Sequence, residues 1–98
     1  MNANHPLIDG KRAKQLVAAG AILVDVRNPV AYRDHSITPS VNLSLRQIST
    51  LQQYPKTTTI IVVGDDSDAN TLRSALKYAA LYGFTKLYNL GDISNWDK

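Results

Sequence analysis

The segment from residue 59 to residue 82 constrains the fold most, because it reads as a strand, a loop and a helix in direct succession. Residues 59–63 (TIIVV) form a β-branched run without polar alternation, which is typical of a strand buried on both faces of a parallel sheet. Gly64 ends this run, and apolar residues then return at helical spacing at Leu72, Ala75, Leu76, Ala79 and Ala80. The loop therefore lies between the carboxyl end of a strand and the amino end of a helix, where open α/β sheets bind ligands.

The loop carries three carboxylates, one hydroxyl and one amide, but no thiol. Its residues are Gly64, Asp65, Asp66, Ser67, Asp68, Ala69 and Asn70. Acidic side chains are typical of a first helical turn, because they satisfy free N–H groups and the positive end of the helix dipole. Clustered carboxylates are also the ligands that magnesium and calcium prefer. Helix capping and a metal-assisted hydrolase or phosphoryl-transfer site are therefore both open interpretations.

Length and composition bound the function classes. A chain of 98 residues predicts one domain, residues 1–98, with a modest core. The absence of cysteine excludes a disulfide framework, a thiolate zinc site and a cysteine nucleophile. The net charge is +3, and the one basic cluster, Lys11 to Lys14, has no interleaved aromatic residues, so we expect no nucleic-acid partner. With no long apolar run and no signal-peptide pattern in MNANHPLIDGK, we expect no membrane association and a cytoplasmic location.

The remaining chain alternates short strands and helices. A brief strand at 7–8 precedes a helix that Asp9 can cap, and 21–26 (AILVDV) is a second buried strand. The later elements are a short helix from Asn28, a strand at 41–43, a helix over 45–53 capped by Ser44, a strand at 85–90 and a final turn with Trp96. This order predicts an α/β fold with a parallel sheet of about five strands and helices on both faces.

The stretch LVDVRNPVAYRDHSITPSVNL resembles the pattern of the rhodanese-like family: an apolar strand ending in Asp-x-Arg, a helix with an aromatic residue, a loop, and a strand ending in Asn-Leu. The matching residues are Asp25, Arg27, Pro29, Tyr32, His35, Ile37, Val41 and Asn42. Further on, Arg73-Ser74-Ala75 is similar to the Arg-Ser-Ala that opens the family's active-site helix, and LYNLGDISNW is similar to the family's ending. The resemblance spans about residues 7–96 and implies a single rhodanese-like domain.

The activity that this resemblance implies is sulfur transfer by a cysteine at the start of the loop. The thiolate takes up the sulfur, and loop N–H groups with the helix amino end hold its charge. Counted from the strand, the place of this cysteine falls at Gly64 or Asp65; counted back from Arg73, it falls at Asp68. None of these residues can carry sulfur. We therefore predict a thiosulfate-sulfurtransferase fold without a catalytic residue.

The predicted function is a catalytically inactive rhodanese-like module that binds an unidentified protein or small ligand through loop 64–70 or its surface, without a metal or cofactor. The predicted site residues beside the loop are Asp25, Arg27, His35 and Arg73. We interpret Asp25 and Arg27 as a structural ion or hydrogen-bond pair, and His35 as a structural loop histidine. The open alternatives are a metal-assisted enzyme that uses the Asp-rich loop and an accessory protein in sulfur transfer.

Overall fold

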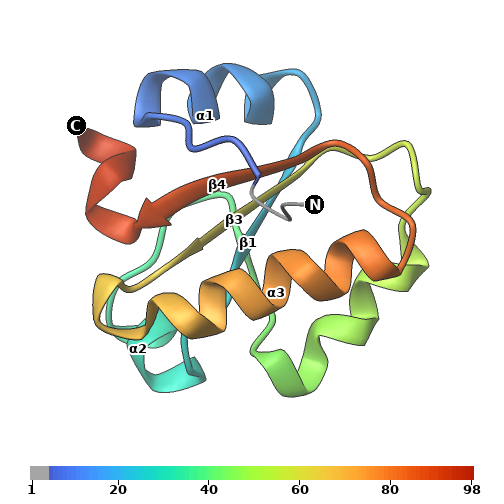
Figure 1. Ribbon diagram of the computed structural model, residues 1–98. Helices are drawn as coiled ribbons and strands as arrows, with labels where there is room; N and C mark the ends of the chain where they lie inside the picture. The colour runs from blue at the N-terminus through green and yellow to red at the C-terminus, as the bar shows by residue number, and fades with distance from the viewer. Residues whose placement is uncertain (1–4) are drawn as a thin grey trace.

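A parallel sheet forms the centre of the protein in the computed structural model, which describes residues 5–98 (Figure 1). Its four strands lie in the order β2-β1-β3-β4, and all neighbours are parallel. The strands are β1 (Ile22–Asp25), β2 (Val41–Asn42), β3 (Ile60–Gly64) and β4 (Leu87–Asp92). The prediction of a single α/β domain built on a parallel sheet is confirmed. Residues 1–4 lie outside the described residues. They are part of the predicted domain range and of the amino-terminal segment that was searched for a signal peptide.

The sheet has four strands among residues 5–98, where the sequence predicts about five. Residues 7–8 contribute only an isolated parallel bridge to Asn89, with hydrogen bonds of 2.9 Å on either side of it. Pro6 accepts one of these bonds but has no N–H to donate. Asp9 then caps helix α1 (Gly10–Ala18) directly after the bridge. The segment between the proline and the cap is therefore too short for a ladder.

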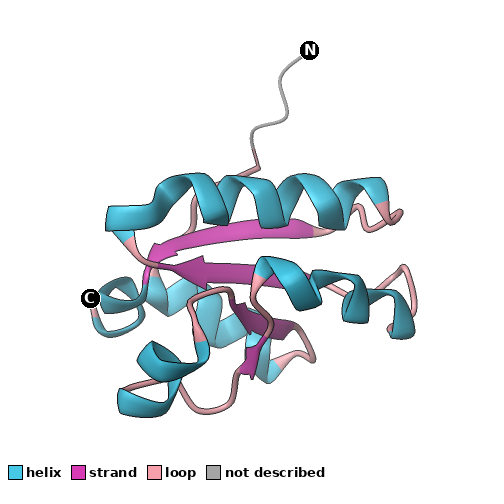
Figure 2. Ribbon diagram, turned by 90° about the horizontal axis from the view of Figure 1, so that it is seen from below, coloured by secondary structure: helices cyan, strands magenta, loops and turns pink. Residues whose placement is uncertain are grey.

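Helices cover both faces of the sheet (Figure 1). On one face lie α1 and the carboxyl-terminal 3₁₀-helix η3 (Ile93–Asp97); on the other lie the 3₁₀-helix η1 (Leu45–Gln53) and α3 (Ala69–Leu81), which Figure 2 views from their side. Two short helices, α2 (Pro29–Asp34) and η2 (Asp66–Asp68), follow β1 and β3. Among residues 5–98, no helix has the length and apolar character needed to cross a membrane.

Strand β3 is fully buried and supplies both cores. Ile60 and Val62 belong to the cluster under η1 and α3, whereas Ile61 and Val63 belong to the cluster under α1 and η3. The alternation follows from the period of two along a strand. The β-branched run that the sequence shows is therefore the strand shared by both faces.

The segment over 45–53 is a 3₁₀-helix rather than an α-helix. Leu45, Ile48 and Leu51 pack in the same core cluster, and their spacing of three matches the three residues per turn of a 3₁₀-helix. Ser44 makes no side-chain capping bond, and its hydroxyl instead lies 3.4 Å from Gln47 Oε1. Ser44 therefore occupies the predicted N-cap position, but its side chain does not cap the helix.

Helices α1 and η3 approach each other closely at Gly10. A Cβ on Gly10 would lie 2.3 Å from the backbone oxygen of Trp96 and 2.4 Å from that of Asn95. Trp96 packs partly buried against the core under α1, and the Lys14 ammonium lies 5.2 Å from the centroid of its ring. The first residue of α1 must therefore be a glycine for the last turn of the chain to pack where it does.

Candidate functional site

The carboxyl ends of β1, β2 and β3 surround a cavity of about 370 Å³. This is the edge of a parallel sheet at which ligands bind in open α/β folds. We call this cavity the loop pocket. It is lined by Val26, Arg27, Asn28, Ala31, Ser44, Leu45, Gly64, Asp65, Ser67, Asp68 and Thr71.

Gly64 lets the loop pocket form between β1 and α3. It is the last residue of β3 and is buried. A Cβ there would lie 3.2 Å from Leu72 Cδ1 and 3.3 Å from Val26 Cγ2, which is closer than ordinary van der Waals contact. A glycine at this point therefore allows α3 to start tightly against the end of the sheet.

Two loop carboxylates accept hydrogen bonds from backbone N–H groups, one in the loop and one in the first turn of α3. Asp65 Oδ1 accepts from the Ser67 N–H at 2.9 Å and from the Ser67 hydroxyl at 2.8 Å. Asp68 caps α3, because its Oδ1 accepts from the Thr71 N–H at 3.4 Å and its Oδ2 from the Thr71 hydroxyl at 2.6 Å. N–H groups at such a loop and helix start are the donors that bind an anion in other folds. Here the chain's own carboxylates take them.

Asp92 is a third carboxylate in this arrangement, and it comes from the end of β4. Its Oδ1 accepts from the Asp66 N–H at 2.9 Å, and its Oδ2 accepts from the Ser94 N–H at 3.0 Å. The sequence analysis did not predict Asp92 as a site residue. The sequence signal for Asp92 was its position just after the predicted last strand. The carboxyl ends of parallel strands lie at one edge of the sheet, so a residue there is close to the loop after the central strand.

These hydrogen bonds favour the charged carboxylates. The pKa of Asp65 is lowered, chiefly by the Ser67 N–H and then by the Ser67 hydroxyl. The pKa of Asp92 is lowered as well, chiefly by the Ser94 hydroxyl and then by the Asp66 N–H. Negative charge therefore already occupies the place where an anion would be stabilised, which makes sulfate, phosphate or thiosulfate a poor ligand.

Replacing Asp92 with asparagine is expected to lower the melting temperature at neutral pH and to change it less in acid. A lowered pKa means that the stabilisation from Asp92 is complete above the pKa of an unfolded aspartate, about 3.9, and is lost as the pH falls through the folded value. Melting curves of both proteins from about pH 7 down to about pH 2 measure the difference. A difference that stays constant over this range would contradict the role given to the charge.

Asp25 and Arg27 form an ion pair at the loop pocket, which Arg27 lines and the buried Asp25 does not. Arg27 Nη2 lies 2.8 Å from Asp25 Oδ2, Nε lies 3.1 Å from both carboxylate oxygens, and the Arg27 N–H donates to Oδ1 at 2.9 Å. The Asp25 carboxylate raises the pKa of the guanidinium. Asn42 Nδ2 donates to the backbone oxygens of both residues, at 3.0 Å and 2.9 Å. This network fixes the turn between β1 and α2.

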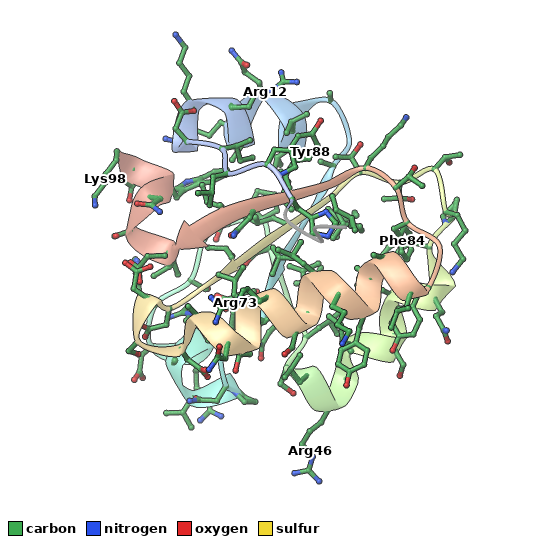
Figure 3. All side chains as sticks on the ribbon, in the orientation of Figure 1. Arg12, Arg46, Arg73, Phe84, Tyr88 and Lys98 are labelled. Carbon is green, nitrogen blue, oxygen red and sulfur yellow. The ribbon has the colours of Figure 1, made fainter. Side chains whose placement is uncertain are left out.

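His35 and Arg73, like Asp25, lie outside the lining. His35 is exposed at the end of α2, where its carbonyl accepts a hydrogen bond from Arg27. Arg73 is exposed on α3 and donates to Asn70 (Figure 3). Asp66 and Ala69 are exposed too and are not part of the lining. The structure thus brings Arg27 together with four of the seven loop residues: Gly64, Asp65, Ser67 and Asp68.

Sequence reasoning missed the contributions of two other segments to the loop pocket. Asn28, the N-cap of α2, and Ala31 of α2 line it, and so do Ser44 and Leu45 from the chain after β2. Thr71 completes it from the first turn of α3. Each of the first two segments directly follows a predicted strand, so the strand ends were the available signal.

The loop carboxylates do not gather into a metal site. Within residues 5–98, no group of three or more His, Cys, Asp or Glu side chains is placed to hold a metal ion. Asp65 and Asp68 instead accept hydrogen bonds from Ser67 and Thr71. Capping hydrogen bonds therefore explain the positions of these two carboxylates. The described residues offer no set of ligands for the metal-assisted enzyme considered above.

Residues 9–98 match the family model described as the rhodanese-like domain. The chain therefore belongs to the rhodanese-like family, and within it this is a member that has no cysteine. No curated protein matches the chain.

Solved structures of the same fold come from distant organisms. The rhodanese-like domain of an Anabaena sp. protein superposes with a TM-score of 0.76 at 20% identity, covering 96% of this chain and 74% of the other. A single-domain sulfurtransferase from Saccharomyces cerevisiae gives 0.74 at 17% identity, with 95% and 89% covered. A rhodanese-related protein from Thermoplasma volcanium gives 0.71 at 19% identity, with 95% and 91% covered. At these identities the likeness shows the fold alone.

Proposed function

We propose that this rhodanese-like domain transfers no sulfur and acts as a binding module whose recognition site is the loop pocket. The observation that carries the proposal is an open cavity of about 370 Å³ at the end of the sheet in a chain without cysteine. A cavity of this size matches the lower range of small-ligand sites in proteins. The bound group is a small ligand or a side chain of a partner protein, and we expect the module to work in the cytoplasm.

The chemistry of the lining supports this proposal. Sulfur transfer needs a thiolate as the nucleophile, whereas the polar side chains at the loop pocket are hydroxyls, carboxylates, an amide and a guanidinium. The guanidinium of Arg27 is committed to Asp25, so the exposed charge of the lining is that of Asp65 and Asp68. A ligand that donates hydrogen bonds, neutral or cationic, suits these acceptors better than an anion does.

The purified protein is expected to produce no thiocyanate from thiosulfate and cyanide above the buffer blank. The physical reason is that no side chain of this sequence can hold a persulfide. A cysteine-bearing rhodanese assayed in parallel controls for the reagents. Thiocyanate production that disappears when Ser67 or Asp65 is replaced by alanine would overturn the proposal.

Binding at the loop pocket is tested by nuclear magnetic resonance of isotope-labelled protein with a panel of small amines, alcohols, carboxylic acids and thiosulfate. We expect saturable shifts at Ala31, Ser44 and Thr71 with amines or alcohols and none with the anions. Ala31→Phe, which fills the cavity, should abolish these shifts. Ala80→Phe, on the exposed face of α3, should leave them unchanged. Shifts with no member of the panel, or equal shifts in the Ala31→Phe protein, would contradict a pocket-based function.

A further inference from the structure

A second cavity lies away from the loop carboxylates, between η1 and α3. Its volume is about 330 Å³. We call it the η1–α3 groove, and it is lined by Leu45, Arg46, Ile48, Ser49, Tyr78 and Tyr82. The two helices pack on the same face of the sheet, and Figure 2 looks onto them. The groove is therefore a feature of the helical face rather than of the sheet edge.

Two large side chains of α3 are exposed: Tyr78, which lines the η1–α3 groove, and Leu81, which precedes the lining residue Tyr82. Tyr78 is 42% exposed and Leu81 is 69% exposed. On a helix, residues three and four apart are neighbours, so Tyr78 lies beside both Leu81 and Tyr82. By this spacing Tyr78, Leu81 and Tyr82, the C-cap of α3, make up one strip of large side chains, which we call the apolar strip. Tyrosine is enriched in the energetically dominant parts of protein interfaces.

The two helices beside this strip carry charge of one sign. The two helices that form the groove, residues 45–53 and 69–81, contain no acidic residue but carry Arg46, Arg73 and Lys77. Arg46 lines the groove itself, and Figure 3 shows its side chain extending away from the body of the protein. Lys77 is four residues before Leu81, so it lies next to the apolar strip.

We propose that the η1–α3 groove docks an acidic segment of a partner protein that carries bulky aliphatic or aromatic side chains. The apolar side chains of the segment lie in the groove against Tyr78 and Tyr82. Its carboxylates meet Arg46 and Lys77 at the rim, which steers the encounter and selects against basic segments. This inference does not depend on the loop pocket, because only Leu45 lines both cavities.

The test is a titration of isotope-labelled protein with a synthetic peptide of alternating Glu and Leu or Phe residues. A peptide in which every Glu is replaced by Lys serves as the second probe. The third probe is a vesicle of phosphatidylcholine and phosphatidylglycerol, and the fourth is a single-stranded oligonucleotide. We expect saturable shifts at Ile48, Ser49 and Tyr82 with the acidic peptide alone, and weaker binding as salt is added.

Variants localise the effect. Tyr78→Ala and Arg46→Glu should each weaken binding of the acidic peptide by about tenfold or more. Lys11→Glu makes the same charge change at an exposed position of α1, on the other face of the sheet, and should leave the affinity unchanged. The proposal is overturned by equal binding of the Lys peptide, by tighter binding of vesicles or oligonucleotide than of the acidic peptide, or by the absence of saturable groove shifts at millimolar peptide. Because Ala31→Phe blocks only the loop pocket, it should not alter this binding.

Discussion

Replacing Asp25 with alanine is expected to destabilise the fold by about 3 to 5 kcal/mol, the range measured when one partner of a buried ion pair is removed. Asp25 is 1% exposed and its partner Arg27 is 11% exposed, so the guanidinium has little access to water. The substitution leaves this charge without its carboxylate and also removes the acceptor of the Arg27 N–H. For a domain of this size, each kcal/mol lowers the melting temperature by about 4 to 8 °C.

The matched control for Asp25→Ala is Asp34→Ala, which removes an exposed carboxylate on α2. Surface substitutions of this kind change the free energy of unfolding by about 0.5 kcal/mol or less. Urea denaturation of both variants and of the parent chain gives the comparison. Equal denaturant midpoints for the two variants would show that the ion pair does not hold this part of the fold together.

Replacing Gly10 with alanine is expected to destabilise the fold by about 3 kcal/mol, at the upper end of the usual cost of overpacking. A single added methyl group would lie 2.3 Å and 2.4 Å from two backbone oxygens of η3. These atoms cannot rotate away as a side chain can, so α1 and η3 must separate. The separation also exposes Trp96, the one tryptophan of the chain, to water.

Two measurements check the effect of Gly10→Ala. Thermal melting measures the loss of stability. The fluorescence emission of Trp96 in the native protein should shift to longer wavelength if its ring becomes exposed to solvent. Lys11→Ala, at the next residue of α1 with an exposed side chain, is the control and should alter neither reading appreciably. An unchanged melting temperature for Gly10→Ala would mean that α1 and η3 are not packed as described.

The fold was largely predictable because its strongest signals are local. The run at 59–63 marked the buried central strand, and the Asp9 and Asn28 caps marked two helices that the structure contains. The differences also have local causes: an amino-terminal segment too short to form more than one bridge, and a helix whose apolar spacing of three selects the 3₁₀ form.

The candidate site was only partly predictable, because its composition depends on which strands lie side by side. The loop itself follows from the strand–helix junction, and Arg27 follows from the Asp-x-Arg pattern. Ala31, Ser44 and Leu45 enter the loop pocket only because β2, β1 and β3 are neighbours in that order. Asp92 likewise reaches the loop only because β4 pairs with β3. Strand order is a long-range property that no single segment encodes.

The burial of β3 between two cores also bears on how the domain opens. Ile60 and Val62 hold one helical layer, and Ile61 and Val63 hold the other, so neither layer can detach without uncovering a strand that the opposite layer needs. The two faces therefore behave as one cooperative unit. Amide hydrogens of β3 should exchange with solvent only on global unfolding, whereas those of the exposed η2 turn exchange through small local openings. A partner that binds either helical layer consequently stabilises both.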